Sequence, residues 1–312
     1  MVYFNRIHVF KLVLAGIIIF SLTSCSAQER GESALVESEQ FKNYWYSGKA
    51  ELTHYKLEQA RYGEIHPGDA VLIFVTEDFF TDKQVKYERG PKPKTVETVL
   101  KLNFMRNFTT GIYPYSMMTS VFTPLKPHNS HSLKVSSSSQ EWCGHTYMQL
   151  NTREQDYEIR LHSYFQNEAD QQLNIKKAWL EDEIWTNIRL APESLPSGEI
   201  EILPGFQYLR LKHQPTRLQK AMATLSETTN PALSDKPLKV YTIDYQDIDR
   251  KLMITYEGEF PYQIVAWEET YPSGFGQPRR LTTRAVRTHT LLTDYWTKNS
   301  LADSTYRKML GF

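Results

Sequence analysis

Alternation of apolar and polar positions dominates the chain after residue 41 and predicts strands. Residues 49–59 alternate, turn signals follow at Gly63 and at 67–69, and residues 71–76 form a run typical of a buried strand. Alternation is typical of a strand with one buried face, whereas a short apolar run between turns is typical of a strand covered on both faces. The two segments therefore predict an antiparallel pair.

The same pattern extends over nearly all of the remaining chain. Further strands are expected at 95–106, 118–123, 132–137, 140–150, 157–165, 171–175, 206–213, 238–245, 250–257, 262–270 and 280–290. Short strands separated by Gly, Pro, Asn and Asp turns favour a mainly β protein, with one large curved antiparallel sheet or half-barrel. Neither an internal repeat nor a break in composition divides residues 41–312, which are predicted to form a single domain.

Two segments depart from the strand pattern. Residues 180–196 carry apolar side chains at roughly helical spacing and end at two prolines, which predicts a short helix. Its apolar positions are Ile184, Ile188 and Leu190. In 293–310, apolar side chains again fall near one helical face, so a C-terminal helix is expected to pack back on the sheet.

The N-terminus has the pattern of a secretory signal. Arg6 and Lys11 precede an apolar run at 12–20, and polar residues follow this run directly. A run of about ten apolar residues is too short to cross a bilayer core about 30 Å thick. The segment ends in Leu22-Thr23-Ser24-Cys25, which resembles the bacterial lipobox. We expect residues 1–24 to be a lipoprotein signal peptide; the alternative is an ordinary signal followed by a chance cysteine.

In the lipobox interpretation, Cys25 is the lipidation site that anchors the protein. Each buried CH₂ contributes about 0.8 kcal/mol, so two or three acyl chains would hold the protein stably on a membrane. Residues 25–40 are polar and acidic after the cysteine and are predicted to form a flexible tether. The expected location is the cell membrane or the outer membrane, with the body facing the periplasm.

Composition narrows the classes of partner. The chain holds 36 Lys and Arg against 36 Asp and Glu, a balance that gives no electrostatic reason to expect nucleic-acid binding. The predicted partners are the membrane, reached through lipidated Cys25, and an apolar ligand or an envelope protein. Of the two cysteines, lipidation of Cys25 leaves Cys143 alone, so an intramolecular disulfide is excluded in that case.

The residues best suited to chemistry lie in 138–151. If 140–150 is one strand and pairs with 157–165 as a hairpin, alternation gathers several reactive side chains on one face. They are Cys143, His145, Tyr147, Arg160, His162 and Tyr164. Gly144, between bulky neighbours, marks a bulge or a close backbone approach.

Two interpretations of this face compete. Cys143, His145 and His162 could bind a metal, or a histidine could activate Cys143 as a nucleophile. We favour packing and a polar cavity lining, because a free cysteine is commonly a small buried hydrophobe and Cys-Gly-His lacks the repeated ligand pairs of a zinc motif. These three residues are therefore only candidate catalytic groups, and neither a metal nor another cofactor is assigned.

Two other segments carry less specific signals. Residues 108–122 concentrate Tyr and Met, which indicates either an apolar groove or a core strand after a tight turn. With the polar face above, they supply the candidate ligand-binding residues Tyr113, Tyr115, Met117, Tyr147, Arg160 and Tyr164. The other segment, 279–289, carries a series of basic residues, which indicates either an anion site or, more simply, a solvated edge strand. The series consists of Arg279, Arg280, Arg284, Arg287 and His289.

The ordered series "YSGKAELTHYKLEQARYGEIHPGDAVLIFVTEDF", "VLKLN", "TGIYPYSMM", "QEWCGHTYMQLN" and "LPSGEIEILPG" resembles a family of uncharacterised Bacteroidota lipoproteins along the whole mature chain. Some members carry the label septum formation inhibitor Maf. True Maf proteins are α/β nucleotide pyrophosphatases with Ser-Pro-Arg-Arg near the N-terminus, whereas this chain has Gln277-Pro278-Arg279-Arg280 near its C-terminal end. The resemblance therefore transfers no catalytic residue. The strand pattern is also similar to that of periplasmic half-barrel lipoproteins, a likeness of fold that implies no function.

Two functions follow as hypotheses. The preferred one is a lipid-anchored, non-catalytic binding or scaffold module whose concave face holds an apolar ligand, a lipid or a partner. The alternative is a metal- or thiol-dependent hydrolase centred on Cys143, His145 and His162, which requires those side chains to lie within reach of one another.

Overall fold

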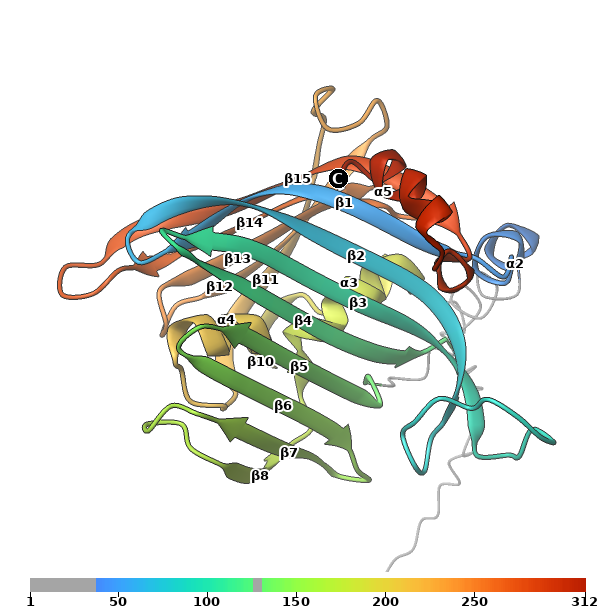
Figure 1. Ribbon diagram of the computed structural model, residues 1–312. Coiled ribbons are helices and arrows are strands. Elements are labelled where there is room, and N and C mark those ends of the chain that lie inside the picture. Colours follow the sequence, from blue (N-terminus) through green and yellow to red (C-terminus); the bar gives the residue numbers. More distant parts are fainter. Residues whose placement is uncertain (1–37, 126–130) are drawn as a thin grey trace, which may run out of the picture.

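The computed structural model describes residues 38–125 and 131–312, and in them fifteen strands form one open, curved sheet (Figure 1). The strands of the first half are β1 (Ala50–Arg61), β2 (Glu64–Phe80), β3 (Val96–Thr110), β4 (Tyr113–Pro124), β5 (Lys134–Glu141), β6 (Gly144–Thr152), β7 (Asp156–Ser163) and β8 (Gln171–Lys176). Those of the second half are β9 (Trp179–Leu180), β10 (Gly198–Leu203), β11 (Gln219–Thr228), β12 (Leu238–Tyr245), β13 (Arg250–Glu257), β14 (Ile264–Ser273) and β15 (Arg279–Thr293). The predicted mainly β, curved-sheet fold is confirmed.

The strand order shows two meanders joined through the first and last strands. The order is β8-β7-β6-β5-β4-β3-β2-β1-β15-β14-β13-β12-β11-β10-β9, and neighbours are antiparallel except β9 and β10. Consecutive strands pair because short turns connect them, as in the one between Arg61 and Glu64. The described edges of the sheet are thus β8 and the two-residue strand β9.

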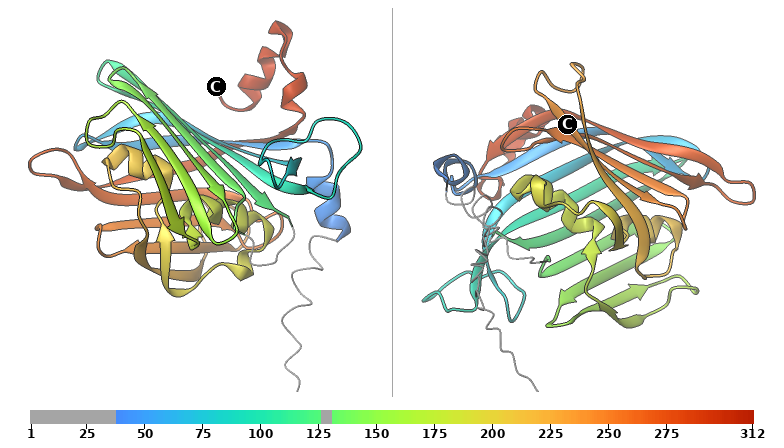
Figure 2. Two further views of the ribbon diagram at one scale, coloured as in Figure 1. Left: turned by 90° about the horizontal axis from the view of Figure 1, so that it is seen from below. Right: turned by 180° about the vertical axis from the view of Figure 1, so that it is seen from behind.

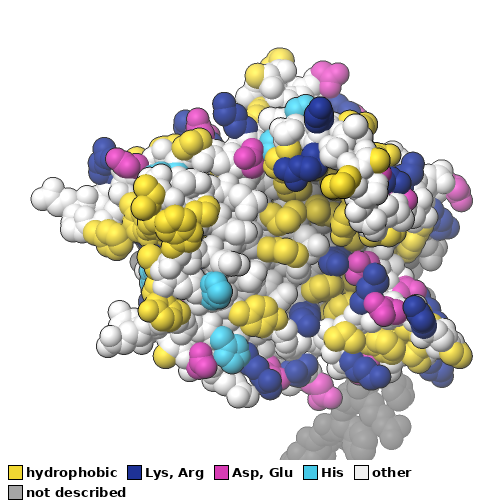
Figure 3. All heavy atoms as spheres, viewed as in Figure 1, with side chains coloured by type: hydrophobic (Ala, Val, Ile, Leu, Met, Phe, Trp, Pro, Cys, Tyr) yellow, Lys and Arg dark blue, Asp and Glu magenta, His cyan; other side chains and the backbone are white. Residues whose placement is uncertain are grey.

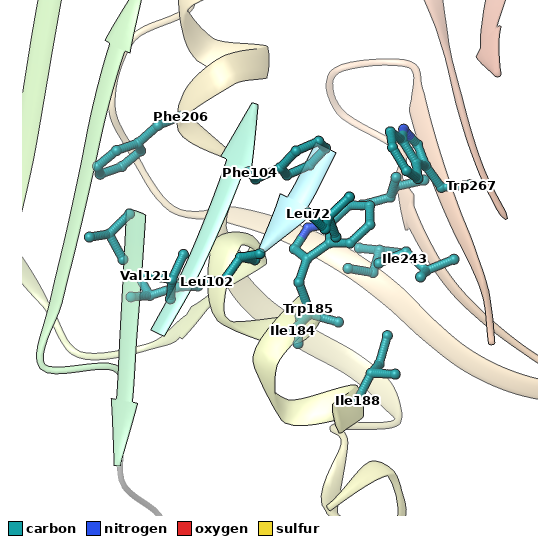
Figure 4. Packing of buried hydrophobic residues seen from close by; sticks show 14 of the residues in the cluster. Leu72, Leu102, Phe104, Val121, Ile184, Trp185, Ile188, Phe206, Ile243 and Trp267 are labelled. Carbon is teal, nitrogen blue, oxygen red and sulfur yellow. The ribbon is translucent and has the colours of Figure 1, made fainter. Parts of the chain in front are cut away.

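Helices fill the concave face of the sheet (Figure 2). Helix α3 (Glu181–Leu190) and helix α4 (Phe206–Lys212) lie inside the curve, whereas α2 (Glu39–Trp45) leads into β1. Trp185 of α3 lies 5.0 Å from the Phe104 ring and 5.4 Å from the Trp267 ring, measured between ring centroids, so the helix joins both halves of the sheet (Figure 4). Helices α3 and α4 thus cover part of the concave face, on which the binding hypothesis expects an open groove of mixed apolar and polar lining.

Buried ion pairs also attach α3 to the sheet. Arg189, fully buried, donates to both carboxylate oxygens of Glu51 at 2.6 and 2.7 Å. Arg250 bridges Glu181 of α3 and Glu269 of β14. Burial alone would raise the pKa of the Glu269 carboxyl, but its neighbouring arginines hold the pKa below its usual value. The Glu269 carboxylate is therefore ionised inside the core.

The C-terminal segment crosses the outer, convex face of the sheet. It contains the 3₁₀ turns η2 (Tyr295–Thr297) and η3 (Leu301–Ser304) and the short helix α5 (Thr305–Met309). Leu310 is buried against Leu52, Val71 and Ile73 of β1 and β2. The expected C-terminal helix that packs back on the sheet is thus present, although it is shorter than residues 293–310.

Several local predictions are wrong. The expected strand 206–213 is helix α4, because apolar and polar side chains of this short segment are buried alike, so alternation does not mark one solvated face. The expected strand 140–150 is divided by a two-residue turn at Trp142 and Cys143. The series from Arg279 belongs to β15, which pairs with β1 and β14 and is not an edge strand.

The N-terminal predictions lie almost entirely outside the described residues. Only Ser38, Glu39 and Gln40 of the predicted tether are described: Ser38 caps α2 by accepting a hydrogen bond from the Phe41 amide at 3.1 Å. The last residues of the predicted tether therefore begin the folded body.

Strands β10 and β11 were not predicted, and the short helix expected in 180–196 is present as α3 with the 3₁₀ turn η1 (Pro192–Ser194).

Candidate functional site

The outer face of strands β4 to β7 carries the polar side chains that alternation grouped together. Tyr147 of β6 lies opposite His162 of β7, and Gln149 lies opposite Arg160. The Tyr164 amide donates to the His145 carbonyl at 3.2 Å, which extends the pairing by one step. Because side chains alternate across a strand, these residues share the face turned away from the helices.

A shallow groove of about 490 Å³ runs across this face; we call it the outer groove. Its lining includes Ser116, Met118, Ser138, Gln140, His145, Tyr147, His162, Tyr164 and Asp170. Figure 3, in the view of Figure 1, shows histidine and apolar side chains side by side on this face. The lining is a mixture of hydroxyls, imidazoles and aromatic rings on a rigid sheet.

Close packing of a ring on the backbone shapes one wall of the outer groove. A Cβ atom on Gly144 would lie 2.5 Å from Cδ1 and 2.9 Å from Cβ of Tyr164. Only glycine lets the Tyr164 side chain lie this near β6 without a shift. The close backbone approach predicted at Gly144 is thus present.

Side-chain hydrogen bonds order the outer face beside the groove. The Tyr147 hydroxyl donates to Gln149 Oε1 at 2.7 Å, Gln149 Nε2 donates to Asn151 Oδ1 at 2.7 Å, and Asn151 Nδ2 donates to Gln84 Oε1 at 2.6 Å. This row fixes rotamers that would otherwise be free in solvent, so the surface is organised before any ligand arrives.

Of the proposed catalytic residues, His145 and His162 line the outer groove, whereas Cys143 is not part of its lining. Cys143 lies exposed in the β5–β6 turn, and His162 Nδ1 lies 3.4 Å from Asp170 Oδ2. A hydrogen bond with the Glu141 carboxylate raises the pKa of the Cys143 thiol, and burial and the negative charge act in the same direction. Among the residues that the structure describes, His, Cys, Asp and Glu form no group of three able to hold a metal ion.

The candidate ligand-binding residues fall on different surfaces. Tyr147, Arg160 and Tyr164 are on the outer face, whereas Tyr115 and Met117 are buried on the inner face with Phe108 and Leu211. The inner side chains fit the core-strand interpretation of 108–122.

Tyr113 is half-buried at the end of the β3–β4 hairpin, and its ring stacks on Trp142 at a centroid distance of 6.3 Å. Its hydroxyl hydrogen-bonds to Tyr62, which raises the pKa of Tyr113. Tyr62 in turn stacks on Phe275 at 5.5 Å. A row of aromatic rings therefore follows the hairpin turns at one end of the sheet.

The basic series of β15 offers no collected anion site. Arg280 pairs with Asp249, Arg284 with Glu268 at 2.9 Å, and Arg287 with Glu257 at 3.0 Å. Arg279 donates to the backbone carbonyl of Gly63. Each guanidinium thus has a partner of its own, and the four do not converge.

Sequence reasoning missed the part of the outer groove that β4, β5 and the β7–β8 turn supply. Ser116 and Met118 alternate with buried Tyr115 and Met117, and Ser138 and Gln140 alternate with buried neighbours in β5. The period-two pattern was therefore present as a signal. Asp170 has no such signal, because it lies in the turn before β8.

In comparisons with known proteins, no family model, curated protein or solved structure matches this chain. In residues 38–125 and 131–312, no helix is long and apolar enough to span a membrane.

Proposed function

We propose that the protein is a lipid-anchored, non-catalytic docking module of the cell envelope, which binds a polypeptide partner in the outer groove. The lipidated Cys25, the location on a cell or outer membrane facing the periplasm, and the kinship with Bacteroidota lipoproteins are parts of this proposal that rest on the sequence. The main support for the docking function is the residue composition of the outer groove, which lies on a β-sheet.

The outer groove combines the residue types that favour protein recognition. Tyr147 and Tyr164 offer large aromatic surfaces with few rotatable bonds, and Ser116, Ser138 and Gln140 offer adaptable hydrogen-bonding groups. Tyrosine with serine is the composition of antibody paratopes, where rigid aromatic contacts supply area at low entropic cost. A polypeptide, which has both apolar and hydrogen-bonding groups, matches this lining better than an acyl chain does.

The position of the groove suits a tethered protein. Helix α2, which follows the tether, lies at the end of the sheet opposite the β1–β2 and β5–β6 turns (Figure 1). The groove, near the β5–β6 end, is thus turned away from the point where the chain would leave for the membrane. A partner can reach it without competing with the anchor.

The chemistry of Cys143 argues against the hydrolase alternative. A nucleophilic cysteine requires a lowered thiol pKa, usually through a neighbouring cation. Here the hydrogen bond with Glu141 raises the pKa of the thiol, which keeps it protonated at neutral pH. The residue is better explained as part of a turn than as a nucleophile.

Site-specific photo-crosslinking in the native envelope tests the proposal. A photoreactive amino acid at Tyr147, 42% exposed in the groove, should give a discrete protein adduct. The matched control is Val286, 40% exposed on the outer face of β15, which should give none. The proposal is refuted if both positions give the same adducts, or if position 147 reacts with lipid alone.

A further inference from the structure

A separate cavity lies on the inner side of the sheet, between β5–β7 and α4. It has a volume of about 120 Å³, and we call it the inner cavity. One wall is apolar and consists of Met148, Leu161, Phe206 and Leu209. The β7–β8 loop and the loop after α4 contribute polar groups at its mouth. Because sheet strands separate this cavity from the outer groove, it can have an occupant of its own.

A chain of hydrogen bonds connects the charged groups around the inner cavity. Glu168 Oε1 accepts from His213 Nδ1 at 2.5 Å, and Arg210 Nη1 donates to His213 Nε2 at 3.1 Å. Arg210 Nη2 donates to Glu141 Oε1 at 3.1 Å. Because arginine can only donate, His213 Nε2 accepts in this hydrogen bond, which leaves Nδ1 to donate to Glu168. Two carboxylates thus share one guanidinium and one imidazole.

One buried donor of this chain has no partner. Arg210 lines the cavity and is 7% exposed, and its Nε–H has no hydrogen-bond acceptor among the described residues. Burial, above all, lowers the pKa of the Arg210 guanidinium. A buried N–H normally has an acceptor, because leaving it unpaired forfeits the hydrogen bond it made to water. An occupant with an accepting oxygen would satisfy it.

We propose that the inner cavity binds an uncharged polyol, or the hydroxylated end of a longer molecule, through about six heavy atoms. A cavity of ~150 Å³ holds benzene, so 120 Å³ suits a group of that order. Hydroxyl oxygens can accept from Arg210 and exchange hydrogen bonds with the Asn167 and Gln214 amides at the mouth, while C–H groups contact the apolar wall.

Repulsion, occupied hydrogen-bond partners and desolvation together disfavour a charged occupant. A carboxylate would add a third negative charge beside Glu141 and Glu168, whose partners are already used. An ammonium group would lie next to the Arg210 guanidinium. Either charge would also lose its hydration on entering a partly enclosed, half-apolar site, which costs far more than for a hydroxyl.

Three probes of matched size test the charge selection on soluble protein that begins at Ser26. Saturation-transfer NMR titrations at about pH 7 compare glycerol with glycerate and 3-amino-1,2-propanediol. We expect saturable binding of glycerol, with each charged analogue weaker by about tenfold or more. Equal affinity for the three probes, preference for a charged one, or no saturable binding up to ~100 mM would overturn the proposal.

Matched variants locate the binding. Thr216→Trp should block the mouth and abolish glycerol binding, whereas Arg217→Trp, on the next, exposed residue that does not line the cavity, should leave it unchanged. Asn167→Leu should weaken binding, with Gln166→Leu as its control. All four positions are at the surface, so unfolding temperatures should stay close to wild type. Glycerol binding that survives Thr216→Trp would contradict the inner cavity as the site.

Discussion

The ion pair between Glu51 and Arg189 provides the sharpest test of how the helices are held inside the sheet. The two side chains are 1% and 0% exposed, and both carboxylate oxygens accept hydrogen bonds from the guanidinium. Arg189 also donates to the Pro261 carbonyl at 2.9 Å. Replacing Arg189 with methionine keeps an apolar stem against the Phe74 ring but removes the charge, so Glu51 is left buried without a counter-ion.

The expected cost follows from this burial. Two unit charges about 4 Å apart attract by about 4 kcal/mol at an effective dielectric constant of about 20. Removing one partner of a buried pair typically costs about 3–5 kcal/mol, because the other charge stays desolvated. We expect that loss for Arg189→Met and a comparable one for Glu51→Gln. For a chain of this size it corresponds to a fall of about 6–20 °C in the melting temperature.

The double variant separates the pair from its surroundings. With both charges absent no buried charge is left unpaired, so Glu51→Gln with Arg189→Met should lose only about 1–2 kcal/mol. Urea denaturation of protein beginning at Ser26, followed by tryptophan fluorescence, gives the free energy of unfolding of each variant. The m-values should be equal, because all variants expose the same surface on unfolding.

The pH dependence provides an independent check. Burial alone would raise the pKa of Glu51, but the charge and hydrogen bonds of Arg189 lower the pKa below the ordinary 4.5. A lowered folded-state pKa contributes stability that is present above the unfolded value and lost as pH falls through the folded one. Wild type should therefore gain stability as pH rises through about 4.5, and Arg189→Met should gain less. Single-variant costs below about 1 kcal/mol, or costs that add in the double variant, would refute the reasoning.

Three further predictions concern other parts of the chain. Burial raises the pKa of Asp182 to about 7, so the folded state holds a proton that the unfolded state releases, and this contribution to stability falls as pH rises from about 4 to 7. Asp182→Asn should flatten that fall in denaturation measurements, and an unchanged slope would count against it. A Cβ on Gly68 would lie 2.3 Å from the Asn107 carbonyl oxygen, so Gly68→Ala should lower the free energy of unfolding by about 1–3 kcal/mol. Gly258→Ala should cost less, because the atom nearest to a Cβ at that position is 3.4 Å away. Equal costs for the two variants would contradict the predicted clash. The rate at which iodoacetamide alkylates Cys143 should reach half its maximum above the usual thiol pKa, and a midpoint at or below neutral pH would revive the nucleophile hypothesis.

Sequence patterns predicted the sheet because its period is short and its turns are explicit. The alternation in 157–165 became β7, where Tyr157, Ile159 and Leu161 are buried as expected. The alternating stretch 49–59 became β1, although residues 50–55 are buried on both faces of the sheet. The helix at 180–196 was indicated by Ile184, Ile188 and Leu190, all of which are buried. These elements could be predicted because the local sequence distinguishes the two-residue period of a strand from the 3.6-residue period of a helix.

The errors occur where tertiary structure overrides local pattern. Residues 206–213 alternate well enough for a strand, but burial on nearly every side removes the contrast on which that interpretation depends. The burial of the charged residues of α3 could not be predicted either. An acidic first turn has the same sequence whether it is solvated or paired with distant strands, as Glu181 is with Arg250. Long-range pairs of this kind have no local signal.

The candidate site was half predicted for the same reason. Alternation placed Tyr147, Arg160 and His162 on one face, which the register confirms. It also assigned Cys143 to that face, since the strand was drawn through the two-residue turn that holds it. The inner cavity could not be predicted, because it depends on α4 meeting β5–β7 across a long stretch of chain.

Affinity for the crosslinked partner tests the central claim most directly. Isothermal titration would compare wild-type protein with Tyr147→Ala and with Val286→Ala, two variants of nearly equal exposure on the same sheet face. If the outer groove is the docking site, Tyr147→Ala weakens binding about tenfold or more while Val286→Ala stays within about twofold of wild type. Equal affinities for the two variants would contradict the account.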